Sequence, residues 1–158
     1  MIKGNKGEWS ELYCLVKILI DGKLYQADIN LNRDLENVYE VLKAYKDEEA
    51  WSLEFHRGDD IKVYEKLLGG RSLVHEYTLE DFGRIVQNLY LGITKGKGKS
   101  FSIPEVEKFL YNAKISKIKA KSNSKSDITL RIYDHRLAKE SDLAFSIKSL
   151  IGGNSTLV

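Results

Sequence analysis

Three residues near the end of the chain have types and a spacing that suit phosphodiester chemistry. Asp127 precedes a run, 128–132, in which apolar and polar residues alternate, while Ser146 and Lys148 close a similar run at 143–147. Alternation with a period of two predicts strands, whose successive side chains point to opposite faces. If the two runs form a hairpin, Asp127, Ser146 and Lys148 converge on the face away from the core.

A glutamate in a predicted N-terminal helix is a further candidate. Over residues 7–20 the helical spacing gives two apolar faces and places Glu11 on the second one, with Cys14, Leu15 and Ile18. A carboxylate among apolar residues is costly unless it is paired or binds a cation. The alternative is a favourable interaction with the helix N-terminus, although that would serve Glu8 better than Glu11.

Together these residues could hold a divalent metal against a phosphodiester. The carboxylates of Asp127 and Glu11 are oxygen ligands that suit Mg²⁺. Lys148 cannot bind the ion, but it can orient a water molecule or balance charge. The chemistry predicted by the residues is therefore metal-assisted hydrolysis.

The distribution of lysine points to a polyanionic partner. The net charge of the whole chain is only +2, yet residues 95–125 contain nine lysines and two glutamates. Lysines near phosphates gain affinity by releasing counterions, so this stretch is a candidate DNA-backbone contact. The alternative is an ordinary solvated surface, because runs of lysine are common there.

Composition restricts the class of protein. With 158 residues, of which 42% are apolar and 30% charged, the chain is expected to form one domain, 1–158, around one core. Cys14 is the single cysteine, and His56, His75 and His135 lie far apart, which argues against a zinc site. No apolar run suits a membrane span or a signal peptide, so we expect a cytoplasmic location and no membrane partner.

The elements that must position these residues form an α/β domain with an α-rich N-terminal half. Besides the helix at 7–20 and the terminal hairpin, we expect three helices and one more hairpin. Ser102 and Glu105 should form the capping box of the last helix. The expected helices are 37–45, 78–91 and 102–113, and the hairpin joins 51–56 to 61–64.

Several of these motifs resemble a known nuclease family. Asp127 opening one strand and Phe145-Ser-Ile-Lys-Ser149 closing the next resemble the PD-(D/E)xK nuclease core, and Lys3–Glu11 resembles the helix that carries an additional glutamate in many of its members. More narrowly, KGNKGEWSELY, DGKLYQAD and FSIKSLIGGNSTL are similar to segments of the HpaII family of type II restriction endonucleases. The resemblance implies a restriction-endonuclease-like core, a mixed β-sheet flanked by helices.

The resemblance also implies roles for individual residues. It makes Asp127 the main metal ligand, Lys148 the lysine of the acidic-x-lysine element and Glu11 the helix carboxylate, with Mg²⁺ as cofactor. Ser146 departs from the wider superfamily because it stands where an acidic ligand is usual. We interpret it as a family variant in which Ser146 offers a hydroxyl and Glu11 supplies the missing charge, with Asp142 as a second candidate acid.

The implied activity is cleavage of double-stranded DNA, with CCGG as the type substrate of the family. The expected DNA contacts are Lys6, Lys95, Lys97, Lys99, Lys121, Lys125, Ser149, Asn154, Ser155 and Thr156. Two-strand cutting favours a homodimer or sequential nicking. The apolar end Leu157-Val158 suggests the N-terminal part of a longer nuclease. Two alternatives stay open, a junction-resolving or repair nuclease of the same superfamily and a non-catalytic basic DNA-binding module.

Overall fold

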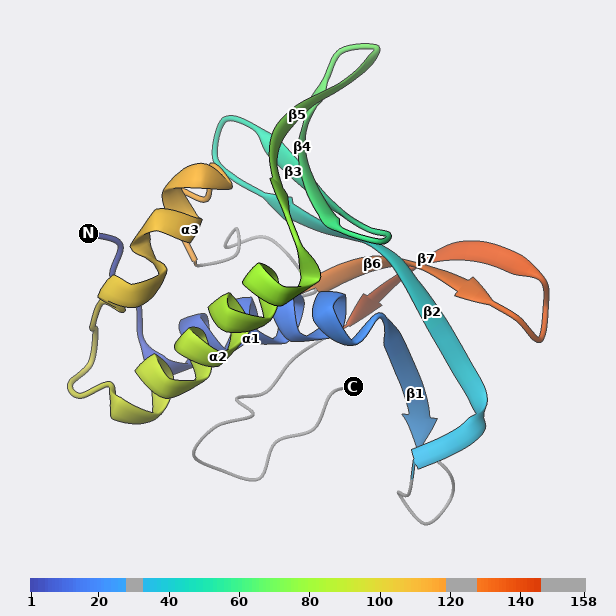
Figure 1. Cartoon of the computed structure of the whole chain (residues 1–158), viewed down its shortest axis with the longest axis horizontal. Coiled ribbons are helices and arrows are strands. Elements are labelled where there is room, and N and C mark those ends of the chain that lie inside the picture. The colour runs from blue at the N-terminus through green and yellow to red at the C-terminus, as the bar shows by residue number, and fades with distance from the viewer. Residues whose placement is uncertain (28–32, 119–127, 146–158) are drawn as a thin grey trace.

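The computed structural model of this chain describes residues 1–27, 33–118 and 128–145 (Figure 1). Its elements, in chain order, are α1 (Lys6–Asp21), β1 (Lys23–Ala27), β2 (Arg33–Asp47), β3 (Ser52–Arg57), β4 (Ile61–Leu67), β5 (Gly70–Tyr77), α2 (Leu79–Lys95), the 3₁₀ helix η1 (Pro104–Val106), α3 (Glu107–Asn112), β6 (Ile128–Asp134) and β7 (Lys139–Phe145). The mixed α/β fold class is confirmed.

A seven-stranded sheet forms the centre of the fold. Its strand order is β5-β4-β3-β2-β6-β7, and β1 pairs with β2 outside this path. Every pairing between the described strands is antiparallel, whereas a mixed sheet was expected. The 15-residue β2 organises the sheet, because β1 and β3 pair with successive parts of it, and β6 pairs with a stretch, 39–45, that overlaps both.

Helix α1 forms where the sequence predicts it, and both of its ends are capped. The side chain of Asn5 accepts a hydrogen bond from the amide of Glu8, whose carboxylate accepts one from the amide of Asn5 in return. At the other end Gly22 adopts a φ of 71°, a left-handed conformation that favours glycine. Arg57 of β3 donates hydrogen bonds to the carbonyls of Leu19 and Ile20, which fixes this helix end against the sheet.

The apolar surface of α1 is broad because the helix packs on two sides. It contacts α2 and also β1, β2 and β3, and Figure 1 shows α1 and α2 side by side. Eight of its residues are buried, namely Trp9, Ser10, Leu12, Cys14, Leu15, Val16, Ile18 and Leu19. The two apolar faces predicted for this helix therefore correspond to packing on two sides.

The remaining helices begin close to their predicted starts, with one difference. The predicted helix at 78–91 is present as α2, and Thr78 caps it by accepting a hydrogen bond from the amide of Asp81. The predicted capping box of Ser102 and Glu105 is wrong, because Ile103 is the N-cap residue and makes no side-chain capping bond. Pro104 instead opens a 3₁₀ turn that leads into the short α3.

The N-terminal half is rich in strands, which corrects the prediction of an α-rich half. The expected helix at 37–45 lies within β2. Val41 and Ala44 are buried there, and Ala44 lies between Phe55 of β3 and Leu130 of β6. Hydrogen bonding to strands on both sides outweighs a local spacing that also suits a helix. The predicted hairpin of β3 and β4 is confirmed. Within the described ranges no helix combines the length and the apolarity needed to cross a membrane.

Candidate functional site

The predicted hairpin at the end of the chain is present as β6 and β7. Ile128 pairs with Phe145, Leu130 with Leu143 and Ile132 with Ser141. Ile128, Leu130 and Ile132 are almost completely buried, while the residues between them are only half-buried, so the predicted alternation is confirmed for β6. The apolar side of this hairpin therefore faces the core, and its other side faces away from it.

The two strand ends next to the proposed catalytic residues are paired. Asp127 directly precedes Ile128 in the sequence and Ser146 directly follows Phe145, and Ile128 and Phe145 are partners across the hairpin. The described residues end at this pair. The predicted site residues outside the described ranges are Asp127, Ser146, Lys148, Lys121, Lys125, Ser149, Asn154, Ser155 and Thr156.

Glu11 lies in the second turn of α1, as predicted. Cys14, Leu15 and Ile18, which follow it on the same helical stripe, are buried with exposed fractions of 1%, 4% and 6%. Glu11 itself is half-buried rather than buried, and it is not an isolated carboxylate. Because Glu11 is only half-buried, the free-energy cost of its charge is lower than it would be for a fully buried carboxylate.

Asp142 is held by a basic partner on the outer face of the hairpin. It pairs with Arg131 across the strands, and the Arg131 guanidinium lies 3.2 Å from its carboxylate. This hydrogen bond raises the pKa of Arg131, while burial and then Asp142 raise the pKa of Tyr45. A carboxylate that is already neutralised by a guanidinium is a weaker ligand for a cation, which makes Asp142 a poorer metal ligand than the sequence suggested.

A basic surface gathers at the end of the molecule where α1 begins and α2 ends. Gly4 forms a bridge with Phe101, through backbone hydrogen bonds of 3.1 and 3.0 Å, and the indole of Trp9 donates to the Phe101 carbonyl at 2.9 Å. This bridge brings the N-terminal segment to the end of the 96–100 loop. The basic end, as we name it, consists of the exposed side chains of Lys3, Lys6, Lys95, Lys97 and Lys99.

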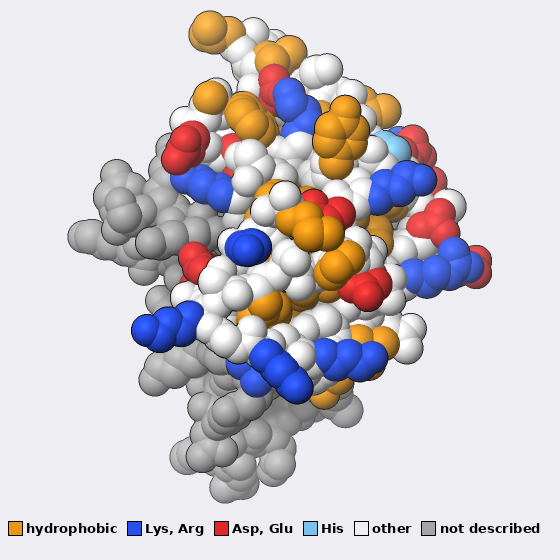
Figure 2. Space-filling model, turned by 90° about the vertical axis from the view of Figure 1, so that its left-hand side faces the viewer, with side chains coloured by type: hydrophobic (Ala, Val, Ile, Leu, Met, Phe, Trp, Pro, Cys, Tyr) orange, Lys and Arg blue, Asp and Glu red, His pale blue; other side chains and the backbone are white. Residues whose placement is uncertain are grey.

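Glycine is required where this loop turns. A Cβ atom at Gly96 would lie 2.3 Å from the Phe101 ring, and Gly98 has a φ of 87°. Figure 2 shows the corresponding face of the molecule, with Lys and Arg side chains along its lower edge. The acids near this end serve the backbone, because Glu8 caps α1 and Glu107 accepts a hydrogen bond from the amide of Ile2. The five lysines outnumber these two carboxylates, so the charge of this group is positive.

A buried ion pair, which the sequence did not reveal, fixes the segment that leads toward β6. Lys46 and Glu48 lie 3.0 Å apart, with side-chain exposed fractions of 11% and 0%. Lys46 donates to the carbonyl of Lys117 at 2.7 Å, and Glu48 accepts from the amide of Ser116 at 2.8 Å. Burial lowers the pKa of Lys46 and Glu48 opposes that effect. The pair therefore ties the end of β2 to the segment just before the remaining lysines of the basic stretch.

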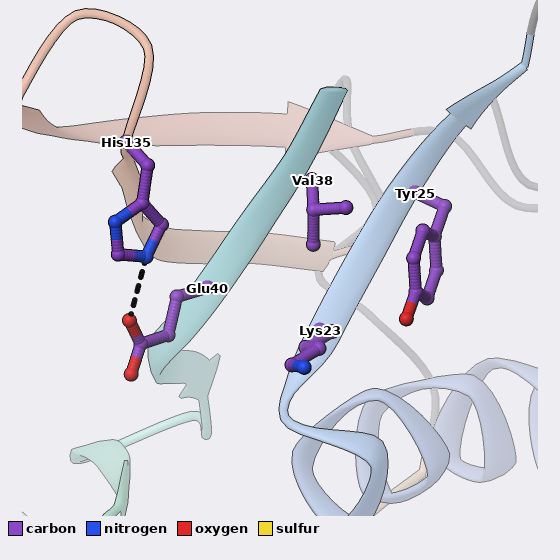
Figure 3. A pocket seen from close by; sticks show the side chains of 5 residues that line it. All are labelled: Lys23, Tyr25, Val38, Glu40 and His135. Carbon is purple, nitrogen blue, oxygen red and sulfur yellow. Dashed lines mark hydrogen bonds and ion pairs between the residues drawn. The ribbon is translucent and has the colours of Figure 1, made fainter. Parts of the chain in front are cut away.

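A polar pocket lies away from these strand ends. It is a cavity of about 430 Å³ lined by Lys23, Tyr25, Val38, Glu40 and His135, and Figure 3 shows Glu40 reaching His135, with a separation of 3.1 Å. His135 belongs to the turn that joins β6 to β7, at the opposite end of β6 from Asp127. The pocket contains none of the predicted site residues.

Comparison with known proteins agrees with the resemblance of the motifs. The family model described as HpaII restriction endonuclease matches residues 5–158. The type II restriction enzyme HpaII of Haemophilus parainfluenzae is 32% identical over 163 residues, an alignment that covers 98% of this chain and 43% of that enzyme. This chain thus spans less than half the length of that relative, and no solved structure matches it. The match along nearly the whole chain, together with the motifs at both of its ends, shows that the chain belongs to the HpaII restriction endonuclease family.

Proposed function

We propose that this chain carries the catalytic metal site of a type II restriction endonuclease, which hydrolyses phosphodiesters of double-stranded DNA at CCGG with Mg²⁺. The observation that supports this most directly is the pairing of Ile128 with Phe145. This pairing brings together two strand ends, one that follows Asp127 in the sequence and one that precedes Ser146. The chain also belongs to a restriction endonuclease family.

The donor chemistry of the proposed residues fits Mg²⁺. Asp127 and Glu11 offer carboxylate oxygens and Ser146 offers a hydroxyl, all of them hard ligands. Among the described residues there is no group of three or more His, Cys, Asp or Glu that could hold a metal, and Asp127 and Ser146 lie outside those ranges. When bound, a divalent ion supplies a Lewis acid for phosphoryl oxygens and makes a nearby water molecule more acidic.

The other residues bind and position the DNA. Lys148 balances the negative charge that develops at the phosphate, because an ammonium group is a compact donor for such oxygens. The lysines of the basic end hold the DNA backbone without reading its sequence. DNA in the cytoplasm is the expected substrate, and cutting of both strands requires either a homodimer or sequential nicking.

The first prediction tests the site directly. Asp127→Asn and Lys148→Ala should each lower the cleavage rate by about 10²- to 10³-fold or more, because each removes a ligand or a charge from the transition state. Cleavage of plasmid DNA containing CCGG, with Mg²⁺ and with Mn²⁺, is the measurement. Activity within a few fold of the parent for either variant would remove the assignment.

Asp142→Asn is the matched comparison on the same hairpin. Because Arg131 already neutralises Asp142, this variant should keep cleavage within a few fold of the parent.

Mapping the cut positions on DNA distinguishes the related nuclease activities. Cuts at one short sequence support a restriction endonuclease, cuts at branched DNA indicate a junction-resolving enzyme, and DNA binding without cleavage at any metal concentration indicates a non-catalytic module.

A further inference from the structure

The β4–β5 hairpin ends in an exposed apolar tip. Leu67 pairs with Gly70, so the loop consists of Leu68 and Gly69, and Gly69 has a φ of 80° that favours glycine. Leu68 is fully exposed, and Leu67 and Leu73 have exposed fractions of 47% and 52%. Figure 1 shows this hairpin projecting beyond the rest of the fold. Leu67 and Leu68 are neighbours at this tip, whereas Leu73 lies on the other face of the hairpin, with Lys66 and Arg71. Two adjacent exposed leucines at the end of a projecting arm are an apolar feature of the kind that marks an interaction site.

Two cations stand directly behind this tip. Lys66 and Arg71 are partners across the hairpin, and both are exposed. Like charges directly opposite each other destabilise a strand pair, so this arrangement favours an anion that bridges them. Figure 2 shows Lys and Arg side chains next to the apolar side chains at the top of the molecule, where the hairpin ends.

Acidic neighbours neutralise this pair only in part. Glu54 lies 3.8 Å from Arg71 and is also hydrogen-bonded to His56, while Glu65 forms an ion pair with Lys114. Lys66 has no ion pair within the part of the chain that the structure describes. The tip therefore combines apolar side chains with positive charge that is available to a polyanion.

The strand register places this tip at the same edge of the sheet as Ile128, the residue that follows the proposed metal ligand Asp127 in the sequence. One row of residues crosses the sheet through successive pairings and consists of Ala144, Thr129, Tyr45, Glu54, Tyr64 and Leu73. Beyond that row β6 reaches its first residue, Ile128, and β4 continues to Lys66 and Leu67. Strand β4 is the third strand from β6, about 15 Å away along the paired row at the usual strand spacing, and the tip projects beyond that row (Figure 1). A duplex that follows this edge of the sheet would pass both the tip and the start of β6.

We propose that the β4–β5 hairpin is a DNA-deforming element, which inserts Leu67 and Leu68 into the minor groove while Lys66 and Arg71 bind the flanking phosphates. The proposal rests on the proposed function, because the DNA is the one held at the metal site. Leucine side chains cannot hydrogen-bond to base edges, so the tip acts as a wedge that partly unstacks a base step and does not read it. Flexible pyrimidine–purine steps are the sites where such unstacking costs least.

The test uses the whole chain and a short CCGG duplex that carries 2-aminopurine beside the site, with Ca²⁺ in place of Mg²⁺. Binding of the parent protein should raise the 2-aminopurine fluorescence, because this base brightens when it unstacks. Replacing Leu67 and Leu68 together by serine should abolish the rise and weaken binding by about tenfold or more, the effect of no longer burying an apolar side chain. Leu137→Ser, at the exposed tip of the β6–β7 hairpin, is the matched control and should change neither quantity.

The outcomes separate this proposal from the proposed function. A parent protein that fails to bind the duplex overturns both. A parent that binds without a fluorescence rise, or a double-serine variant that keeps the rise and the affinity, overturns the wedge alone. A double-serine variant that loses thermal stability or changes its oligomeric mass also overturns it, because the leucines would then contact protein.

Replacing Lys66 and Arg71 by glutamine tests the phosphate contacts. The slope of log affinity against log salt should become shallower by roughly 0.9 for each phosphate that is no longer bound, and an unchanged slope overturns their assignment.

Discussion

Glu8 and Glu11 show that two carboxylates one turn apart on a helix can serve different purposes. Glu8 lies in the first turn of α1 and completes the capping box with Asn5. Glu11 lies beyond the first turn, beside buried Cys14 and Leu15, where the helix N-terminus stabilises it less. The structure therefore gives Glu8 a local structural reason, and Glu11 stays the candidate for the metal site.

Replacing Glu11 by glutamine should weaken Mn²⁺ binding and slow cleavage while leaving the melting temperature in chelator unchanged. Glutamine has nearly the same size and keeps one acceptor oxygen, but it lacks the negative charge that favours a divalent cation. Glu8→Gln on the same helix is the control and should leave the metal affinity unchanged, with a stability loss of about 0.5 kcal/mol. Calorimetry of Mn²⁺ binding and thermal melts in chelator give both readings. Unchanged metal affinity with a lower melting temperature for Glu11→Gln would assign this residue to the fold.

Among the helices and strands, the sequence predicted those that are determined by neighbouring residues. The helices α1 and α2, the β3–β4 hairpin and the alternation of β6 depend on neighbouring residues, and each is present in the structure. Part of strand β2 was predicted as a helix, because its apolar spacing also suits a helix. Strands that pair with it, such as β6, are distant in sequence, so a local pattern does not reveal them. For the same reason, composition alone gave no sign that Lys46 contacts the segment around Ser116.

Loss of the buried Lys46–Glu48 ion pair should lower stability strongly, because this pair ties the end of β2 to the segment around Ser116. Glu48→Gln should lower the free energy of unfolding by about 3–5 kcal/mol, because it leaves the buried Lys46 ammonium without its counter-charge. Adding Lys46→Met to this variant should recover part of the loss, since the buried charge is then gone. Asp21→Asn breaks the exposed Lys17–Asp21 pair and should cost less than about 1 kcal/mol. Denaturant unfolding measures all three, and a cost for Glu48→Gln that matches the Asp21 control would contradict the role of the pair.

Across the whole molecule, positive charge gathers where separate segments meet. The bridge between Gly4 and Phe101 brings Lys3 and Lys6 to the same end as the lysines of the 96–100 loop. The sequence showed a dense lysine stretch, but only the fold adds the N-terminal lysines to it. A field built in this way attracts a DNA backbone at a distance and depends on ionic strength.

Replacing Lys95, Lys97 and Lys99 together by glutamine should therefore weaken binding to specific and random duplexes alike. The slope of log affinity against log salt should become shallower by roughly 0.9 for each phosphate that is no longer neutralised, because fewer counterions are released. Lys23 lines the polar pocket, and Lys139 begins β7 directly after the β6–β7 turn. Both lysines are exposed and lie away from the basic end. Their double glutamine variant is the control and should keep the slope of the parent. Fluorescence anisotropy across a salt series measures both variants, and an equal slope in the triple variant and the parent would show that the basic end does not contact DNA.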